Sequence, residues 1–232
     1  MKTIGLLGGM SWESTVSYYQ LLNRYVNEKL GGLHSAKILL YSVDFAELEA
    51  CLAQGEWERI ADILAEAALK LEKAGADFLA ICTNTMHKVV PQIREKTNLP
   101  LIHIAEAAAD ALLSQGIKKA GLLGTAYTME QEFYRQVLEE KGLEIVIPEA
   151  EERLEINRII FSELCRGIIS PYSKKKYLEI IAELNKNGAE GIILGCTEIG
   201  LLIKPEDTKV PLFDTTEIHA RAIAEYALGK MK

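Results

Sequence analysis

The chain has 232 residues, of which 49% are hydrophobic and 25% charged, a composition typical of a globular protein with a substantial buried core. Its formal net charge of -7, with scattered lysines and arginines, argues against a nucleic-acid-binding surface. No segment reaches the roughly 18 apolar residues of a membrane-spanning helix, and the apolar run near the first residue is too short for a signal peptide. We therefore expect a cytosolic protein that binds neither membrane nor nucleic acid.

The first half of the chain alternates predicted strands and helices. We expect strands at 4–7, 37–43, 78–82 and from 98 onward, and helices through 18–26, 60–71 and 89–96. A glycine-rich loop follows the first strand, and Ser11 or Ser14 is a plausible cap for the next helix. This loop suits an anion, but it carries neither the GxGxxG pattern of dinucleotide sites nor the Gly-Lys-Ser/Thr of a P-loop.

The second half repeats the first. Residues 118–125 match 2–9, residues 188–198 match 75–85, and residues 210–217 match 99–106, in the same order. The repeat predicts an α/β protein of two similar lobes with mainly parallel sheets, related by a pseudo-twofold, with an active-site cleft between them. We expect the first lobe to comprise 1–98 plus 211–232, and the second 99–210.

The strands of the second matching pair, 75–85 and 188–198, end in small polar or nucleophilic side chains. The repeat aligns Thr83 with Cys196, and parallel sheets place their sites at the carboxyl ends of strands. Three interpretations of Cys196 remain open: a small buried hydrophobe, a covalent nucleophile, or a thiol that moves protons. Gly195 and Thr197 on its two sides indicate a strand-to-loop transition, which favours a functional role.

The other cysteines and the histidines give weaker signals. Cys51 and Cys165 fall in predicted helices among apolar neighbours, where we expect buried hydrophobes. No cysteine or histidine spacing indicates a metal site, and no disulfide is needed. His87 should have a structural role at a helix start, and His34 should lie in a loop. Two more histidines lie near the third matching pair, 99–106 and 210–217, and should satisfy local backbone bonds: His103 and His219.

Three short motifs together resemble the signatures of the aspartate/glutamate racemase family: Gly8-Gly-Met10, Thr83-Asn-Thr-Met-His87 and Gly195-Cys-Thr-Glu-Ile199. The resemblance extends over the whole chain. It implies a cofactor-independent homodimeric enzyme of two α/β lobes, whose substrate is an acidic amino acid. Such an enzyme inverts Cα with two cysteines, one on each face of the substrate.

The resemblance also implies roles for individual residues. Cys196 would be one acid/base, and the donors to the substrate's α-carboxylate would be Asn84, Thr85 and Thr197. Further contacts, the last two at the mouth of the cleft, would come from Thr125, Thr128, Met10 and Ser11. Glu198 would tune the charge of Cys196 or bind the amino group, unless it caps the following helix.

The chain departs from the family pattern at the first cysteine, because Thr83 stands directly before Asn84 and Cys82 lies one residue earlier. Neighbouring strand residues point to opposite faces, so we expect Thr83 rather than Cys82 in the cleft. Helix N-termini or neighbouring donors can hold Cys196 as a thiolate, and donors on the carboxylate can stabilise the carbanion. We predict asymmetric catalysis: Cys196 abstracts the proton, while Thr83 protonates directly or through water. Relatives with this pairing suggest the L enantiomer as substrate.

Substrate specificity stays open at this point. Some aspartate-selective relatives carry an arginine after the second strand, which this chain lacks; Arg166 or Lys174 would have to serve instead. Aspartate, glutamate or a broader range all fit. The alternatives are another activity of the superfamily, namely a maleate isomerase, decarboxylase or hydantoin racemase, and a two-lobed anion-binding protein without chemistry.

Overall fold

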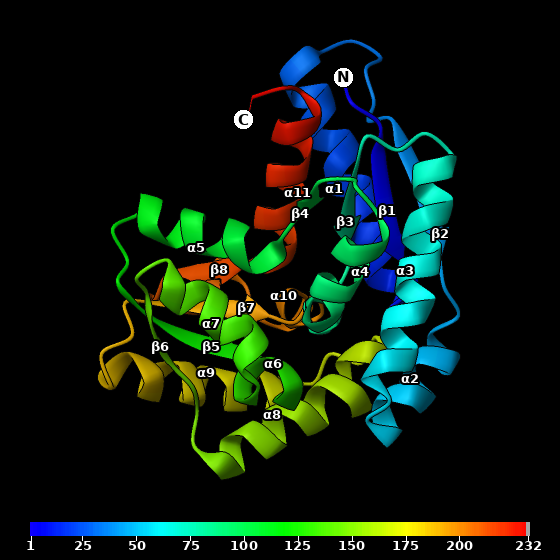
Figure 1. Cartoon of the computed structure of the whole chain (residues 1–232). Coiled ribbons are helices and arrows are strands. Elements are labelled where there is room, and N and C mark those ends of the chain that lie inside the picture. Colours follow the sequence, from blue (N-terminus) through cyan, green and yellow to red (C-terminus); the bar gives the residue numbers. More distant parts are fainter. Residues whose placement is uncertain (231–232) are drawn as a thin grey trace. The chain divides into compact units, whose positions relative to one another are not determined.

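The computed structural model of the chain describes residues 1–230 (Figure 1). The contacts between residues divide it into two units, one formed by residues 1–104 with the chain from 219 onward, the other by residues 105–218. Each unit has one four-stranded sheet whose paired neighbours all run parallel. The α/β class and the parallel sheets predicted from the sequence are therefore confirmed.

The first unit has the strand order β2-β1-β3-β4. Its strands are β1 (Ile4–Gly8), β2 (Ile38–Ser42), β3 (Phe78–Ile81) and β4 (Leu101–Ile102). Its helices are α1 (Trp12–Leu30), α2 (Phe45–Gln54), α3 (Trp57–Lys73), the 3₁₀ helix η1 (Thr85–Val89) and α4 (Val90–Lys96). Two helices contain the boundaries between the units: α5 (Ile104–Ser114) and α11 (Thr215–Ala227).

The second unit repeats this arrangement with the strand order β6-β5-β7-β8. Its strands are β5 (Lys119–Gly124), β6 (Glu144–Val146), β7 (Gly191–Gly195) and β8 (Leu212–Asp214). Its helices are α6 (Ala126–Glu130), α7 (Glu132–Glu140), α8 (Ala150–Ser162), η2 (Leu164–Arg166), α9 (Pro171–Lys186), α10 (Ile199–Leu202) and η3 (Pro205–Asp207). Corresponding strands therefore occupy the same places in the two sheets, as the internal repeat predicts.

The core of the first unit lies between its sheet and two helices. Alternate residues of β1 and β3 point to the same face, where α1 and α11 cover them (Figure 1). The fully buried members of this cluster include Phe78 and Ala80 from β3, Tyr18 and Leu22 from α1, and Ile223 from α11. Position 82 continues the face of Phe78 and Ala80, so the chain beyond β3 remains anchored in the core.

The helix starts follow the predicted signals, whereas two strands are shorter than expected. Ser11 caps α1, since its Oγ accepts a hydrogen bond from the Ser14 backbone N–H at 3.3 Å, and Glu56 occupies the N-cap position of α3. β3 ends at Ile81, one residue earlier than expected, and β4 has only two residues because α5 begins at Ile104.

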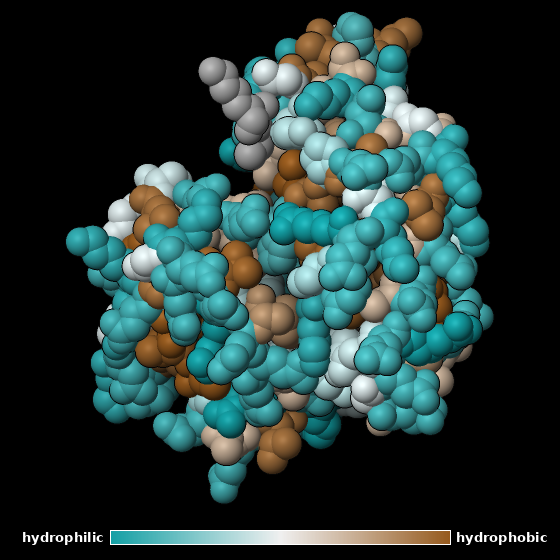
Figure 2. All heavy atoms as spheres, in the orientation of Figure 1, coloured by the Kyte–Doolittle hydropathy of each residue, from teal (hydrophilic) through white to brown (hydrophobic). Residues whose placement is uncertain are grey.

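The face shown in Figure 2 mixes hydrophobic with hydrophilic residues. Exposed large hydrophobic side chains occur on several elements: α1 carries Trp12, Val16, Tyr19 and Leu30, and others are Leu154 of α8 and Leu33 between α1 and β2. Within residues 1–230, no helix combines the length and the apolar character that crossing a membrane requires.

Candidate active site

Cys82 and Thr83, at the end of β3, differ in burial. Cys82 is fully buried and belongs to the hydrophobic cluster with Phe78 and Ala80, and this burial raises the pKa of its thiol. Thr83 is half-buried. Cys82 is therefore part of the packing of the first unit, in a place where a reactive thiolate would be strongly disfavoured.

The turn after Thr83 is held by hydrogen bonds. The His87 N–H bonds to the Asn84 carbonyl at 3.1 Å, and the His87 Nδ1 lies 2.8 Å from the Thr83 carbonyl oxygen. Asn84 and Thr85 are buried, with 3% and 8% of their surface exposed. The short η1 helix thus presents a compact group of polar side chains directly after the strand.

The loop after β1 lies in the same unit, and its shape depends on Gly9. Gly9 has φ +93°, and a Cβ there would meet the backbone of Val43. Its N–H donates to Thr15 Oγ1 at 2.8 Å, so this amide is already used inside the protein. Ser11 and Met10 are nearly buried, at 9% and 5% exposure.

The end of β7 brings Cys196 and Glu198 together. The Cys196 Sγ donates to Glu198 Oε2 at 3.0 Å, and the Thr197 hydroxyl donates to the same oxygen at 2.7 Å. Cys196 is 9% exposed and Glu198 6%. Close packing requires Gly195 before the cysteine, because a Cβ there would lie 2.9 Å from the Leu123 carbonyl oxygen.

This environment corrects one expectation about Cys196. Burial raises the pKa of its thiol well above the usual value, and the negative charge of Glu198 and the nearby Cys165 add to that effect. The thiol is therefore protonated at neutral pH in this structure, rather than held as a thiolate by neighbouring donors. The side chain bonded to the sulfur is an acceptor, which stabilises S–H; the backbone N–H of Glu198 lowers the pKa, but by less than the other causes raise it.

Glu198 does not cap the helix that follows it. It occupies the N-cap position of α10, but its side chain makes no capping hydrogen bond. Its carboxylate instead accepts from Cys196 and Thr197.

Thr125 and Thr128 lie at the start of α6, after β5. Thr125 caps this helix by accepting from the Thr128 N–H at 3.3 Å, and the two hydroxyls are 3.2 Å apart. Thr125 is 7% exposed, whereas Thr128 is fully buried with its methyl group near Gly195. Thr125 is thus the more accessible of the two to a ligand.

Lys174 and Arg166, the two candidate partners of a substrate's side-chain carboxylate, have different surroundings. Lys174 forms an ion pair with Asp207, with 2.7 Å between Nζ and Oδ2, and this pair lowers the pKa of Asp207. Arg166 is exposed at the end of η2. Because the ammonium of Lys174 already has a carboxylate partner, Arg166 is the better placed of the two to meet an anion.

A buried histidine cluster is the feature that sequence reasoning missed. His87, His103 and His219 lie within one group, and His219 bonds to Tyr18 and to the distant Ile102 carbonyl. The expectation of a local backbone bond is therefore wrong for His219. Within residues 1–230, no group of three or more histidine, cysteine, aspartate or glutamate side chains is arranged to hold a metal.

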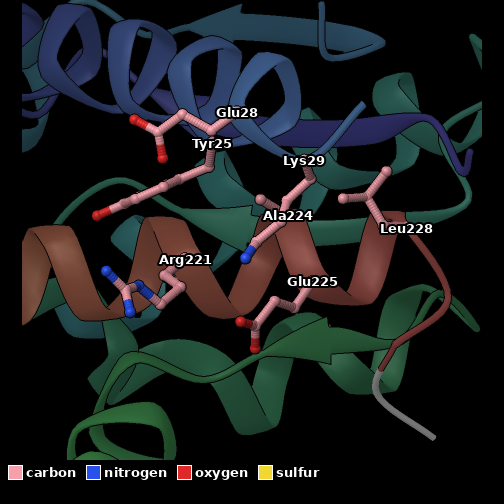
Figure 3. A pocket seen from close by; sticks show the side chains of 7 residues that line it. All are labelled: Tyr25, Glu28, Lys29, Arg221, Ala224, Glu225 and Leu228. Atoms are coloured by element: carbon pink, nitrogen blue, oxygen red, sulfur yellow. The ribbon is translucent and has the colours of Figure 1, made fainter. Parts of the chain in front are cut away.

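Besides a hollow of about 620 Å³ beside Cys51 and Trp57, two others lie in the first unit. One, of about 320 Å³, follows the end of β2 and is lined by side chains of both charges, including Asp44, Arg59 and Lys70. The other, of about 90 Å³, lies between α1 and α11, where Tyr25 and Arg221 face one another (Figure 3). Neither contains Thr83 or a cysteine.

Comparison with known proteins places the chain among racemases. The family model described as Asp/Glu/Hydantoin racemase matches residues 7–223. The crystal structure of a candidate Asp/Glu racemase from Yersinia pestis is 55% identical, with a TM-score of 0.93, covering 98% of this chain and 100% of that one. An aspartate racemase homologue from Pyrococcus horikoshii OT3 is 41% identical, with a TM-score of 0.87 and the same coverage.

A third relative has a wider substrate range. The broad specificity amino-acid racemase of Bacillus subtilis (strain 168) is 23% identical over 232 residues, which cover 94% of this chain and 95% of that protein. The matched family model spans nearly the whole chain, including both strand ends. The chain therefore belongs to the Asp/Glu/Hydantoin racemase family of isomerases.

Proposed function

We propose that this protein is a cofactor-independent racemase that inverts Cα of aspartate, glutamate or both. The observation that carries the proposal is the pair of strand ends: Thr83 follows β3 and Cys196 follows β7, which occupy corresponding places in two sheets of the same order. The names of the relatives support an acidic amino acid as the substrate.

In the proposed reaction, the Cα–H bond of one enantiomer breaks and its proton goes to the sulfur of Cys196. The electron pair stays on the substrate as a carbanion, which donors on the α-carboxylate stabilise: Asn84, Thr85 and Thr197. A new C–H bond forms on the opposite face, with a proton from the Thr83 hydroxyl or from a water bound to it. Solvent then returns a proton to that group.

The contact between Cys196 and Glu198 supports a way to form the required thiolate. The thiol proton passes from Sγ to Oε2 of Glu198 over 3.0 Å, which leaves sulfur free to accept the Cα proton. After the turnover, Glu198 releases its proton to solvent, which balances the proton taken up at the Thr83 face.

The different groups on the two faces make the two directions unequal in kcat and in KM. The enantiomers have equal free energy in water, so kcat/KM must be the same in both directions. A direction bias in kcat is therefore matched by an equal bias in KM.

The test is to incubate both enantiomers of aspartate and glutamate with the enzyme in D2O, followed by chiral chromatography and mass spectrometry. We expect inversion with one deuterium at Cα, and loss of inversion in Cys196→Ala. Cys51→Ala, which removes a buried thiol of α2, should retain wild-type activity. Binding without deuterium uptake would instead identify an anion-binding protein, and a product of different composition would identify another superfamily activity.

A further inference from the structure

We propose that His87 is a positioning residue, whose imidazole fixes the backbone at Thr83 and ties it to the segment where the chain leaves the first unit. This inference rests on the proposed function, in which Thr83 serves one face of the substrate. His87 itself need not touch the substrate.

The hydrogen bonds of His87 define its tautomer. The Ile104 backbone N–H lies 3.2 Å from His87 Nε2, and an N–H can only donate, so Nε2 must be the acceptor. The ring proton is then on Nδ1, which donates to the Thr83 carbonyl at 2.8 Å. One neutral imidazole thus joins two backbone groups 21 residues apart, since 104 − 83 = 21.

Neighbouring side chains hold this imidazole in place. The His87 ring packs edge-to-face against His103 and His219, with 4.6 Å and 5.7 Å between ring centroids. His219 Nε2 donates to the Ile102 carbonyl at 2.9 Å, and its Nδ1 accepts from the Tyr18 hydroxyl at 2.8 Å. The three histidines are at most 6% exposed, so the ring of His87 has little freedom to rotate.

The position of these bonds in the chain gives them their significance. The first unit ends at Ile104 and resumes at His219. The cluster therefore includes a bonded residue at each of the two places where the chain passes between the units. Through His87, the backbone of Thr83 is fastened to one of these places.

The second unit has no counterpart of this imidazole. The internal repeat places Gly200 opposite His87, and the Cys196 carbonyl accepts instead from the Ile199 N–H at 3.1 Å. The side-chain clamp is therefore specific to the Thr83 end and is not a requirement of the repeated strand-turn structure. This favours a role connected with the residue that replaces the family's first cysteine.

The surroundings keep the cluster uncharged. Burial, together with His103 and His219, holds the pKa of His87 well below its usual value. Burial, His219 and Arg94 lower the pKa of His103 to about 3, and burial lowers that of His219 to about 4. At neutral pH these imidazoles remain neutral, which suits positioning rather than proton transfer to the substrate.

The test uses two variants that each keep one of the two bonds. The amide of Asn in His87→Asn reaches the place of Nδ1 and can still donate to the Thr83 carbonyl. The longer Gln in His87→Gln reaches the place of Nε2 and can still meet Ile104, but it loses the bond to Thr83. Tyr18→Phe serves as the control, since it removes a buried polar contact of the same cluster without touching Thr83 or Ile104.

The readout is a ratio of two rates: the rate of inversion, and the rate of deuterium exchange at Cα with retention of configuration. Both are measured with the enantiomer whose exchange is lost in Cys196→Ala. A displaced Thr83 slows protonation of the far face while Cys196 still exchanges the proton. We expect the ratio to fall about 10- to 100-fold in His87→Gln and about threefold or less in His87→Asn. In Tyr18→Phe it should equal that of the wild type.

Equal ratios in the wild type and His87→Gln, or equal losses in both His87 variants, would overturn the inference. A wild-type enzyme without any inversion would instead overturn the proposed function. Should His87→Gln fail to fold, NMR of the wild type with ¹⁵N-labelled histidine decides the matter. His87 must then show the Nδ1–H tautomer at neutral pH, and an Nε2–H tautomer or an imidazolium contradicts the proposal.

Discussion

At the end of β3, the Thr83 carbonyl accepts a hydrogen bond from a neutral imidazole, whereas at the end of β7 the Cys196 thiol donates to a carboxylate. The strands themselves have the same neighbours in the two sheets. Duplication has thus preserved the backbone while the side chains around the two ends have diverged. At one end a neutral imidazole bonds to the backbone, and at the other a thiol bonds to a carboxylate.

The same divergence appears in the next pair of matching segments, residues 99–106 and 210–217. His103 stands where the second unit has Asp214, and His87 stands where it has Gly200. In the first unit these positions form an imidazole pair with 4.6 Å between centroids, while Gly200 lies against the Asp214 carboxylate. Burial raises the pKa of Asp214 and lowers that of His103, so each lies in a place that disfavours its charged form.

The largest expected effect separates the roles of Cys196 and Thr83. Cys196→Ala should lower kcat by about 10³- to 10⁴-fold, because it removes the group that breaks the Cα–H bond. Thr83→Ala should lower it by about 10- to 100-fold, because water can deliver a proton to that face. Steady-state kinetics with both enantiomers measures the two losses. A larger loss in Thr83→Ala would reverse the proposed asymmetry.

Glu198→Gln should have a smaller effect and change the pH dependence. The amide cannot take the thiol proton, so we expect kcat to fall by about tenfold. Loss of the carboxylate charge also lowers the pKa of Cys196, which Glu198 raises in the wild type. Burial still holds this pKa high, however, and without the carboxylate the thiol must lose its proton to solvent before it can act, so the acid limb of the rate profile should move to higher pH. An acid limb at the wild-type pH would show that Glu198 does not control this thiol.

The histidine cluster should make the first unit sensitive to acid. His103 and His219 have folded-state pKa values of about 3 and about 4, against 6.5 in the unfolded chain. The unfolded chain therefore binds more protons once the pH falls below 6.5, and the free energy of unfolding decreases from there toward pH 3. Above pH 6.5 the contribution to stability is complete.

Urea unfolding between pH 7 and pH 5 measures this slope. Each buried neutral histidine contributes up to about 1.4 kcal/mol per pH unit. His103→Gln should reduce the slope by about one histidine's share. An unchanged slope in that variant would mean that His103 is already accessible to protons in the folded state.

The fold could be predicted further than the chemistry of the site. The matching segments predicted two parallel sheets, because a strand that ends in glycine or small polar residues can be recognised from a short stretch of sequence. The alternation of strand residues indicated that Cys82 and Thr83 point apart, and Cys82 does belong to the buried cluster. These inferences needed only local periodicity.

The histidine cluster could not be predicted, because it depends on contacts between residues far apart in the sequence. The bond from His219 to Ile102 joins positions 117 apart, and the imidazole of His87 reaches Ile104. No spacing in the sequence indicates such pairs. The protonated state of Cys196 was also hidden, because its pKa depends on how deeply the thiol is buried and on which way Glu198 turns.

The smallest effect should come from Cys82→Ala. It removes one buried sulfur from the hydrophobic cluster, so we expect unfolding to become easier by about 1 kcal/mol. Activity per folded molecule should equal that of the wild type, as measured with protein titrated for its folded fraction. Loss of activity beyond the loss of folded protein would return Cys82 to the candidate catalytic groups.

The central claim is that Cys196 and Thr83 act on opposite faces of one substrate. Isotope exchange in Thr83→Ala tests it most directly, with the enantiomer whose exchange requires Cys196. The account predicts that this variant still incorporates deuterium at Cα with retention, while the rate of inversion falls about 10- to 100-fold. Equal loss of exchange and inversion in Thr83→Ala, or inversion that persists in Cys196→Ala, would contradict it.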